Sequence, residues 1–287
     1  MTPWIPWLPV RPVVMGILNV TPDSFSDGGR FVDVDRATEH GRELARQGAA
    51  IVDVGGESTR PGADPVDADE EAARVLPVIA ALAPHVRVSV DTAKAEVAAA
   101  AVEAGATLIN DVSASLHQVA AEHGVGWVAM HMQGRPRTMQ HQPAYDDVVA
   151  EVEAFLRHRA ERAREAGVEE VWIDPGIGCG KTFDHNWQLL AHLDRLAATG
   201  FPVAVGTSRK AFLGAAMAAA DQIDTTVPTS DRLEGSVATA VHAVASGAAM
   251  VRVHDVAATV AALGAAGSAD RPSPVDGHDR EESSAWL

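Results

Sequence analysis

The residues best suited to chemistry stand together in one short polar stretch, NVTPDSFSDGG, at residues 19–29. It combines an asparagine amide, two carboxylates, hydroxyl groups and an aromatic ring, and it ends in two glycines. The apolar run VVMGIL at residues 13–18 comes directly before it, and this short run with its β-branched residues predicts a buried strand. Loops mounted on rigid elements commonly carry binding residues. The stretch therefore predicts a ligand-handling loop.

Polar residues also end seven other apolar runs. In chain order, the eight runs end in Asn19, Asp53 with Glu57, Asp91, Asn110 with Asp111, His131, Asp174, Ser208 with Arg209 and Lys210, and Arg252 with His254. At a single strand end, a polar residue needs no functional explanation. Amides, carboxylates and basic groups at the ends of eight strands of one fold predict a polar small-molecule site.

The elements that position these residues follow a repeating pattern. Six segments share a helical stretch that ends in glycine, two or three further residues and then an apolar run; the glycines are Gly48, Gly105, Gly124, Gly167, Gly200 and Gly247. Glycine just past a helix is a common C-cap, and near-continuous apolar runs are typical of parallel strands buried on both faces. Helical patterns cover residues 34–47 and 231–246, the second with Asp231 and Glu234 at capping-box spacing. Pro77 predicts a kink or a break in the helix before the third strand.

Eight strands alternating with helices predict an α/β protein with a single (β/α)8 TIM barrel and an active site at the C-terminal rim of the strands. A doubly wound sheet would need a G-x-G-x-x-G turn after the first strand, and none is present there. The 287 residues suit one barrel, which needs roughly 250. We expect an extended N-terminal arm at residues 1–12, the barrel at residues 13–267 and a disordered acidic tail at residues 268–287.

The bulk properties exclude some partners. The net charge of −16 argues against binding to nucleic acid or to an anionic membrane surface. No apolar run reaches the length of a membrane span. The one cysteine, Cys179, allows no intrachain disulfide, which fits a reducing cytoplasm and predicts a cytoplasmic protein.

The strand-end residues divide by the chemistry that they can recognise. Asp91, Asn110 and Asp174 suit a heterocycle with an amino-pyrimidinone edge, since a carboxylate accepts two parallel N–H bonds. Asn19 offers an oxygen to Mg²⁺, which needs few protein ligands when phosphates are present. The basic residues that suit phosphate oxygens and a carboxylate are Arg60, Arg209, Lys210, Arg252 and His254.

Eight motifs in a fixed order link the chain to a family. They are MGILNVTPDSFSDGG, DVGGESTRPGA, SVDT, IND, AMHMQG, DPGIGCGKT, GTSRKAFLG and VRVHDV, between about residue 13 and about residue 263. In this order they resemble the motifs of the dihydropteroate synthases. The resemblance implies a barrel transferase of folate biosynthesis that joins a dihydropterin, carried as its hydroxymethyl diphosphate, to the amine of 4-aminobenzoate. It also implies Mg²⁺ as cofactor and a homodimer.

The resemblance assigns roles to individual residues. It implies that Asn19 serves the Mg²⁺ and diphosphate position and that Asp27 lies near the developing cation. The residues expected to act in catalysis are Asp27, Arg60, Lys210, Arg252 and His254. The residues expected to bind substrate are Phe25, Thr59, Pro61, Asp91, Asn110, Met130, Asp174, Ser208, Lys210, Arg252 and His254, with Phe25, Arg60, Pro61 and Ser208 on the aminobenzoate side.

One motif departs from the family pattern. The family commonly has an aromatic residue where this chain has Cys179, which puts the shape of the aminobenzoate subsite in question. Two alternatives stay open: a pterin-dependent methyltransferase barrel and a non-catalytic pterin-binding paralogue. The presence of both polar loops argues against the methyltransferase. Retention of the loop and diphosphate residues, such as Asp27, Arg60 and Arg252, argues against the paralogue.

Overall fold

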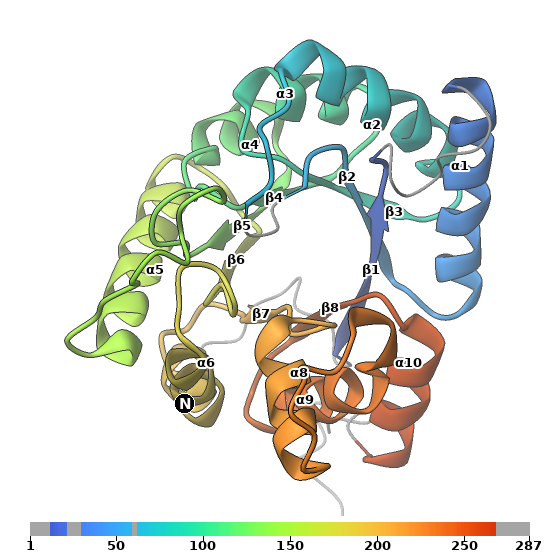
Figure 1. Ribbon diagram of the computed structural model, residues 1–287. Coiled ribbons are helices and arrows are strands. Elements are labelled where there is room, and N and C mark those ends of the chain that lie inside the picture. Colours follow the sequence, from blue (N-terminus) through green and yellow to red (C-terminus); the bar gives the residue numbers. More distant parts are fainter. Residues whose placement is uncertain (1–11, 22–29, 59–61, 268–287) are drawn as a thin grey trace, which may run out of the picture.

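The computed structural model describes residues 12–21, 30–58 and 62–267, and these form a barrel of parallel strands with helices around it (Figure 1). The strands are β1 (Val13–Asn19), β2 (Ile51–Gly55), β3 (Arg87–Asp91), β4 (Leu108–Asp111), β5 (Gly126–Met130), β6 (Val171–Asp174), β7 (Ala204–Val205) and β8 (Met250–Val253). They are ordered β6-β5-β4-β3-β2-β1-β8-β7, and a parallel bridge between Ile173 and Val203 joins the two ends of this sheet. The (β/α)8 barrel expected from the sequence is confirmed.

The helices lie outside the ring of strands (Figure 1). They are α1 (Arg30–Arg46), α2 (Ala68–Leu82), α3 (Ala95–Glu103), α4 (His117–His123), α5 (Val148–Glu165), α6 (Phe183–Ala191), α7 (Leu193–Ala197), α8 (Ala211–Ala220), α9 (Leu233–Ala245) and α10 (Val256–Ala265). In the described part of the chain, no helix is both long enough and apolar enough to cross a membrane. The expected arm at residues 1–11 and tail at residues 268–287 lie outside the described residues.

Both faces of the strands are buried, as parallel strands require. Val14 and Leu18 of β1 pack in the large cluster between the strands and the helices. Val13 and Met15 of the same strand belong to a second cluster, with Leu108 and residues of β2, β5, β6, β7 and β8, that fills the barrel interior. This alternation explains why the strands read as continuous apolar runs. Apart from Asp53 and Ser89, which are buried within β2 and β3, the polar residues of the strands stand at or next to the strand ends.

The glycine pattern also holds. All six glycines that were expected to end helices have positive φ angles, between 64° at Gly124 and 113° at Gly105. In each case the chain turns from a helix into the next strand within a few residues.

Three local expectations were wrong or incomplete. α9 begins at Leu233 with Arg232 as N-cap and without a side-chain capping bond, so the capping box of Asp231 and Glu234 does not form. Arg232 instead turns inward and donates to the carbonyls of Val227 at 2.8 Å and Arg209 at 2.9 Å, which draws Asp231 into a preceding 3₁₀ turn.

Helix boundaries near the loops differ as well. α2 continues through Pro77, so of the two expected outcomes, a kink or a break, the break does not occur. α1 begins at Arg30, four residues before the expected start at Val34.

Candidate active site

Backbone register places the functional side chains of neighbouring strands at one level of the barrel. Asp91 at the end of β3 pairs with Gly55 on one side and Asn110 on the other. Met130 at the end of β5 pairs with Asp174 at the end of β6. The predicted heterocycle-binding residues therefore form one row on the C-terminal rim.

Arg252 of β8 reaches across the rim to two carboxylates. Its Nε donates to Asp53 Oδ2 at 2.6 Å, and its terminal nitrogen donates to Asp91 Oδ2 at 2.6 Å. Asn110 Nδ2 also donates to Asp53 Oδ2, at 2.9 Å. Because a carboxylate can only accept, Asn110 turns its amide nitrogen toward Asp53 and presents its carbonyl oxygen elsewhere as an acceptor.

The charges in this network are strongly coupled. Burial raises the pKa of Asp91 to about 7, and repulsion from Asp53 adds to the rise while Arg252 opposes it. Burial disfavours the charged form of Arg252, but Asp53 and Asp91 raise its pKa, so the guanidinium remains ionised. The rim thus has one firmly positive group, held between two buried carboxylates.

Asp174 stands at the start of a tight turn after β6. It is 6% exposed, and its Oδ1 accepts a 2.7 Å hydrogen bond from the backbone N–H of Gly176. Burial raises its pKa, while the charge of Lys210 and the Gly176 hydrogen bond lower it. Lys210, the N-cap of α8, runs across the turn and donates to the carbonyl of Ile177. An ideal Cβ on Gly178 would lie 2.9 Å from Lys210 Cδ, so glycine leaves the room that the lysine uses.

Two other glycines let this turn approach the turn after β5. An ideal Cβ on Gly176 would lie 1.8 Å from the carbonyl oxygen of His131, and one on Gly180 would lie 2.2 Å from that of Gln133. Both glycines have φ near 63°. Neither position tolerates a side chain, which is the physical reason for the DPGIGCGK pattern.

Ser208 and His254 meet on the opposite side of the rim. Ser208 Oγ lies 2.9 Å from His254 Nδ1 and accepts the backbone N–H of His254 at 3.1 Å. Arg209 was also expected to bind an anion, but its side chain forms a two-point ion pair with Asp255, at 3.0 and 2.6 Å. Arg209 is therefore committed to a structural partner, and its φ of 59° holds the backbone in the left-handed region.

Residues 15–254 match the family model described as pterin binding enzyme. The chain belongs to this family. It is 46% identical over 261 residues to dihydropteroate synthase of Escherichia coli strain K12, an alignment that covers 88% of this chain and 90% of that protein.

Solved structures of pterin-binding enzymes agree with this membership. The Xanthomonas albilineans dihydropteroate synthase with 4-aminobenzoic acid is 48% identical, with a TM-score of 0.81, and the match covers 89% of this chain and 92% of that one. The same enzyme in complex with 7,8-dihydropteroate is 46% identical, with a TM-score of 0.78 and the same coverage of both chains.

Several of the residues that the family motifs singled out lie outside the described residues. They are Phe25, Asp27, Thr59, Arg60 and Pro61. Their roles stay predictions. The described residues bring together Asp91, Asn110, Met130, Asp174, Ser208, Lys210, Arg252 and His254 at the C-terminal rim.

Asn19 ends β1 beside Gly55 in the register of the rim, and it is half-buried. In the described ranges, no group of three or more His, Cys, Asp or Glu side chains is arranged to hold a metal. A single amide oxygen suits a Mg²⁺ ion whose other ligands are phosphate oxygens and water, so the donor set fits the ion as the pterin-binding motifs imply.

Sequence reasoning placed Asp53 among the polar strand ends but gave it no role, and it gave Lys181 no role either. Asp53 accepts hydrogen bonds from both Arg252 and Asn110, and an aspartate inside the apolar strand IVDVG was the available signal. Lys181 is 1% exposed behind the turn of Asp174, and a scarce lysine in a glycine-rich loop was its signal.

Cys179 is 7% exposed and packs with Val112, Met130 and Met139. Ile177 and Phe212, two residues that could have filled the space of the missing aromatic ring, belong to the other, larger core cluster. Cys179 therefore stands beside a predicted substrate-binding residue, Met130, in a small cluster rich in methionine.

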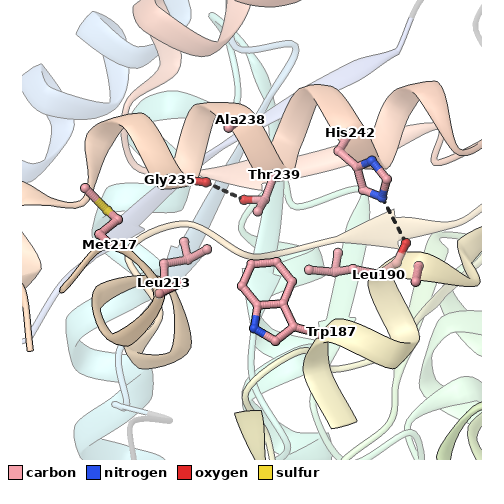
Figure 2. A pocket seen from close by; sticks show the side chains of 10 residues that line it. Trp187, Leu190, Leu213, Met217, Gly235, Ala238, Thr239 and His242 are labelled. Atoms are coloured by element: carbon pink, nitrogen blue, oxygen red, sulfur yellow. Dashed lines mark hydrogen bonds between the residues drawn. The ribbon is translucent and has the colours of Figure 1, made fainter. Parts of the chain in front are cut away.

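An apolar hollow of about 450 Å³ lies apart from this rim, between α6, α8 and α9 (Figure 2). Trp187, Leu190, Leu213, Met217 and His242 line it, and His242 Nε2 lies 3.1 Å from the Leu190 carbonyl. The rim residues are absent from its lining. Because its walls are the outer helices, this hollow is a surface feature and a separate place from the candidate active site.

Proposed function

We infer that this chain catalyses the dihydropteroate synthase reaction. It condenses (7,8-dihydropterin-6-yl)methyl diphosphate with 4-aminobenzoate and releases 7,8-dihydropteroate and diphosphate. The observation that carries this conclusion is the division of one rim into two chemical halves. Hydrogen-bond acceptors from β3, β4 and β6 line one part of the rim, and cationic or donor groups from the β7–α8 turn and β8 adjoin them, with Arg252 bonded to Asp91 where the two groups meet.

The acceptor half suits the pterin edge. Asp91, Asn110 and Asp174 offer carboxylate and carbonyl oxygens at one level, and an amino-pyrimidinone edge presents parallel N–H donors. Asp53 fixes the amide of Asn110 in the accepting orientation. Lys210, which crosses the turn of Asp174, is placed to contact the ring system from the side of α8.

The cationic half suits the diphosphate. Arg252 and His254 project from the end of β8, and Ser208 holds His254 through Nδ1. We propose that Asn19 helps to hold Mg²⁺ against the phosphate oxygens and that Thr59 contributes to the same subsite. When bound, the ion neutralises charge on the departing diphosphate.

The chemical step breaks one bond and forms another. The C–O bond to diphosphate breaks with its electron pair on oxygen, and the exocyclic carbon is left electron-poor beside the pterin ring. The amine nitrogen of 4-aminobenzoate donates its lone pair to that carbon and then loses a proton to solvent or to the departing diphosphate. Arg252 and His254 favour the reaction where negative charge develops.

We propose that the loop residues complete the site. Asp27 would stabilise the developing cation, and Phe25, Arg60, Pro61 and Ser208 would bind 4-aminobenzoate. Exclusion of water has a chemical purpose here, because water competes with the amine for the electron-poor carbon.

A turnover assay tests this function. Purified protein with the pterin diphosphate, 4-aminobenzoate and Mg²⁺ should yield dihydropteroate, identified by chromatography. The test variant is Arg252→Lys, which keeps a positive charge but loses the planar guanidinium that bridges Asp53 and Asp91. The turnover of this variant should fall at least tenfold. Methyl transfer to an acceptor without diphosphate release would instead identify a methyltransferase barrel.

We further propose that the enzyme is a cytoplasmic homodimer. Four large apolar side chains are exposed on or next to α6, α8 and α9: Phe183, Trp187, Ile223 and Leu233. The hollow of Figure 2 lies between the same helices, which supports this face as the contact between two copies. Light scattering tests it: wild type should have twice the mass of the chain, and Trp187→Glu should shift toward one chain. A monomeric wild type would refute it.

A further inference from the structure

Lys181 is a fully buried cation behind the candidate pterin site. Its side chain is 1% exposed, and its Nζ lies 3.0 Å from the carbonyl oxygen of Cys179, 3.0 Å from His131 Nδ1 and 3.4 Å from the carbonyl oxygen of His131. Its three N–H donors thus meet three neutral acceptors. Among the described residues, no carboxylate forms an ion pair with it. Burying an ammonium in this way is unfavourable unless the surroundings hold it firmly.

The contacts of Lys181 join two turns of the rim. Cys179 lies in the turn between β6 and α6, and His131 directly follows β5. The carbonyl oxygens of four successive residues in the first turn accept hydrogen bonds from four different side chains. The pairs are Ile177 with Lys210, Gly178 with Gln140, Cys179 with Lys181, and Gly180 with Tyr145. Lys181 is the member of this set that is buried inside the turn.

The ammonium also lies directly behind Asp174. Gly176 donates its N–H to Asp174 Oδ1 at 2.7 Å, and an ideal Cβ on Gly176 would lie 3.5 Å from Lys181 Nζ. Burial raises the pKa of Asp174, and the charges of Lys210, Arg252 and Lys181 oppose that rise. Burial lowers the pKa of Lys181 to about 8, so the side chain is mostly protonated at neutral pH.

We propose that Lys181 is a positioning residue for the pterin subsite: it locks the turn that carries Asp174 onto the end of β5 and places a positive charge behind that carboxylate. This inference rests on the proposed pterin site. The other two lysines of the chain are placed differently. Lys94 pairs with Glu57 and Glu71, and Lys210 reaches the turn from α8.

Calorimetric titration with 6-hydroxymethylpterin, which lacks the diphosphate, tests the role. Lys181→Gln removes the charge but keeps an amide donor for the Cys179 carbonyl, whereas Lys181→Met removes both. We expect at least tenfold weaker pterin binding at pH 7 in both variants, with the KM for 4-aminobenzoate changed less than twofold. Lys94→Met is the matched control, since it removes a half-buried lysine of the same rim that has other partners.

The pH dependence separates positioning from mere stability. Asp174 is faced by Lys210 from α8, Arg252 from β8 and Lys181 from its own turn, with Asp91 joined to Arg252. Without Lys181, one fewer positive charge opposes protonation of Asp174, so the pKa of Asp174 should rise. The acid limb of pterin affinity should therefore move to higher pH in the Lys181 variants and stay at the wild-type pH in Lys94→Met.

Two results overturn different claims. If wild type binds pterin and Lys181→Gln binds it within threefold, with an unmoved acid limb and only a lower melting temperature, Lys181 is a structural residue and the inference fails. If wild type itself does not bind pterin, the proposed function fails. If Lys181→Met does not fold, Lys181→Gln decides the question alone.

Discussion

The Asp174→Ala variant, which lacks the carboxylate, should lose most of its affinity for the pterin. The side chain is 6% exposed, so a ligand that bonds to it is desolvated with it. Truncation of one partner of a buried, charge-assisted hydrogen-bonded pair costs about 2–5 kcal/mol. At about 1.4 kcal/mol for each factor of ten, Asp174→Ala should weaken pterin binding about 30- to 4,000-fold. Calorimetry with 6-hydroxymethylpterin measures this directly.

Asp174→Asn controls for damage to the turn. Its Oδ1 can still accept the Gly176 N–H, which Asp174 accepts at 2.7 Å, so the turn keeps its cap. Its NH₂ group would face the N–H donors of the pterin edge, and two donors repel each other. We therefore expect Asn to keep the wild-type melting temperature and to lose pterin binding almost as fully as Ala. Pterin affinity within threefold of wild type in the Asn variant would show that the heterocycle is bound elsewhere.

Three further outcomes are expected. Turnover should require Mg²⁺, while binding of a diphosphate-free pterin should not, because the ion serves phosphate oxygens; full activity after thorough chelation would contradict this. Cys179→Phe should overpack the cluster of Val112, Met130 and Met139 and lower stability by about 1–3 kcal/mol; an unchanged melting temperature with a lower KM for 4-aminobenzoate would instead place residue 179 in that subsite. Burial lowers the pKa of His131 to about 3, so the unfolded chain binds a proton there near pH 6.5 and the folded chain does not, and stability falls as pH falls from 7 toward 4. His131→Gln should flatten this slope in denaturant unfolding, and an identical slope would mean that His131 does not titrate on unfolding.

The rim could be predicted because one rule of the fold places it. Strand ends of a parallel barrel converge, so Asp91, Asn110 and Asp174 were found by reading where each apolar run stops. The same rule included Asp53, but it could not show that Asp53 binds Arg252, because the two residues are 199 positions apart in the chain.

Partners that are distant in the chain explain the remaining differences. Arg209 was expected to bind an anion at a helix start, but its guanidinium forms an ion pair with Asp255, which follows β8. Lys181 is buried against His131, which lies fifty residues earlier in the chain, so its place could not be read from the local sequence. Arg232 is held by the carbonyls of Val227 and Arg209, and this tertiary contact overrides the local capping pattern at Asp231. Local spacing specifies elements and strand ends, whereas the pairing of buried charges depends on the assembled barrel.

The fate of the bridging oxygen tests the central claim most directly. The substrate is prepared with ¹⁸O between the pterin methylene carbon and the diphosphate, and the products with 4-aminobenzoate are analysed by mass spectrometry. Cleavage of the C–O bond followed by attack of the amine predicts unlabelled 7,8-dihydropteroate and one ¹⁸O in the released diphosphate. Labelled hydroxymethylpterin with no dihydropteroate would show cleavage at phosphorus by water, and would contradict the assignment of this rim to dihydropteroate synthesis.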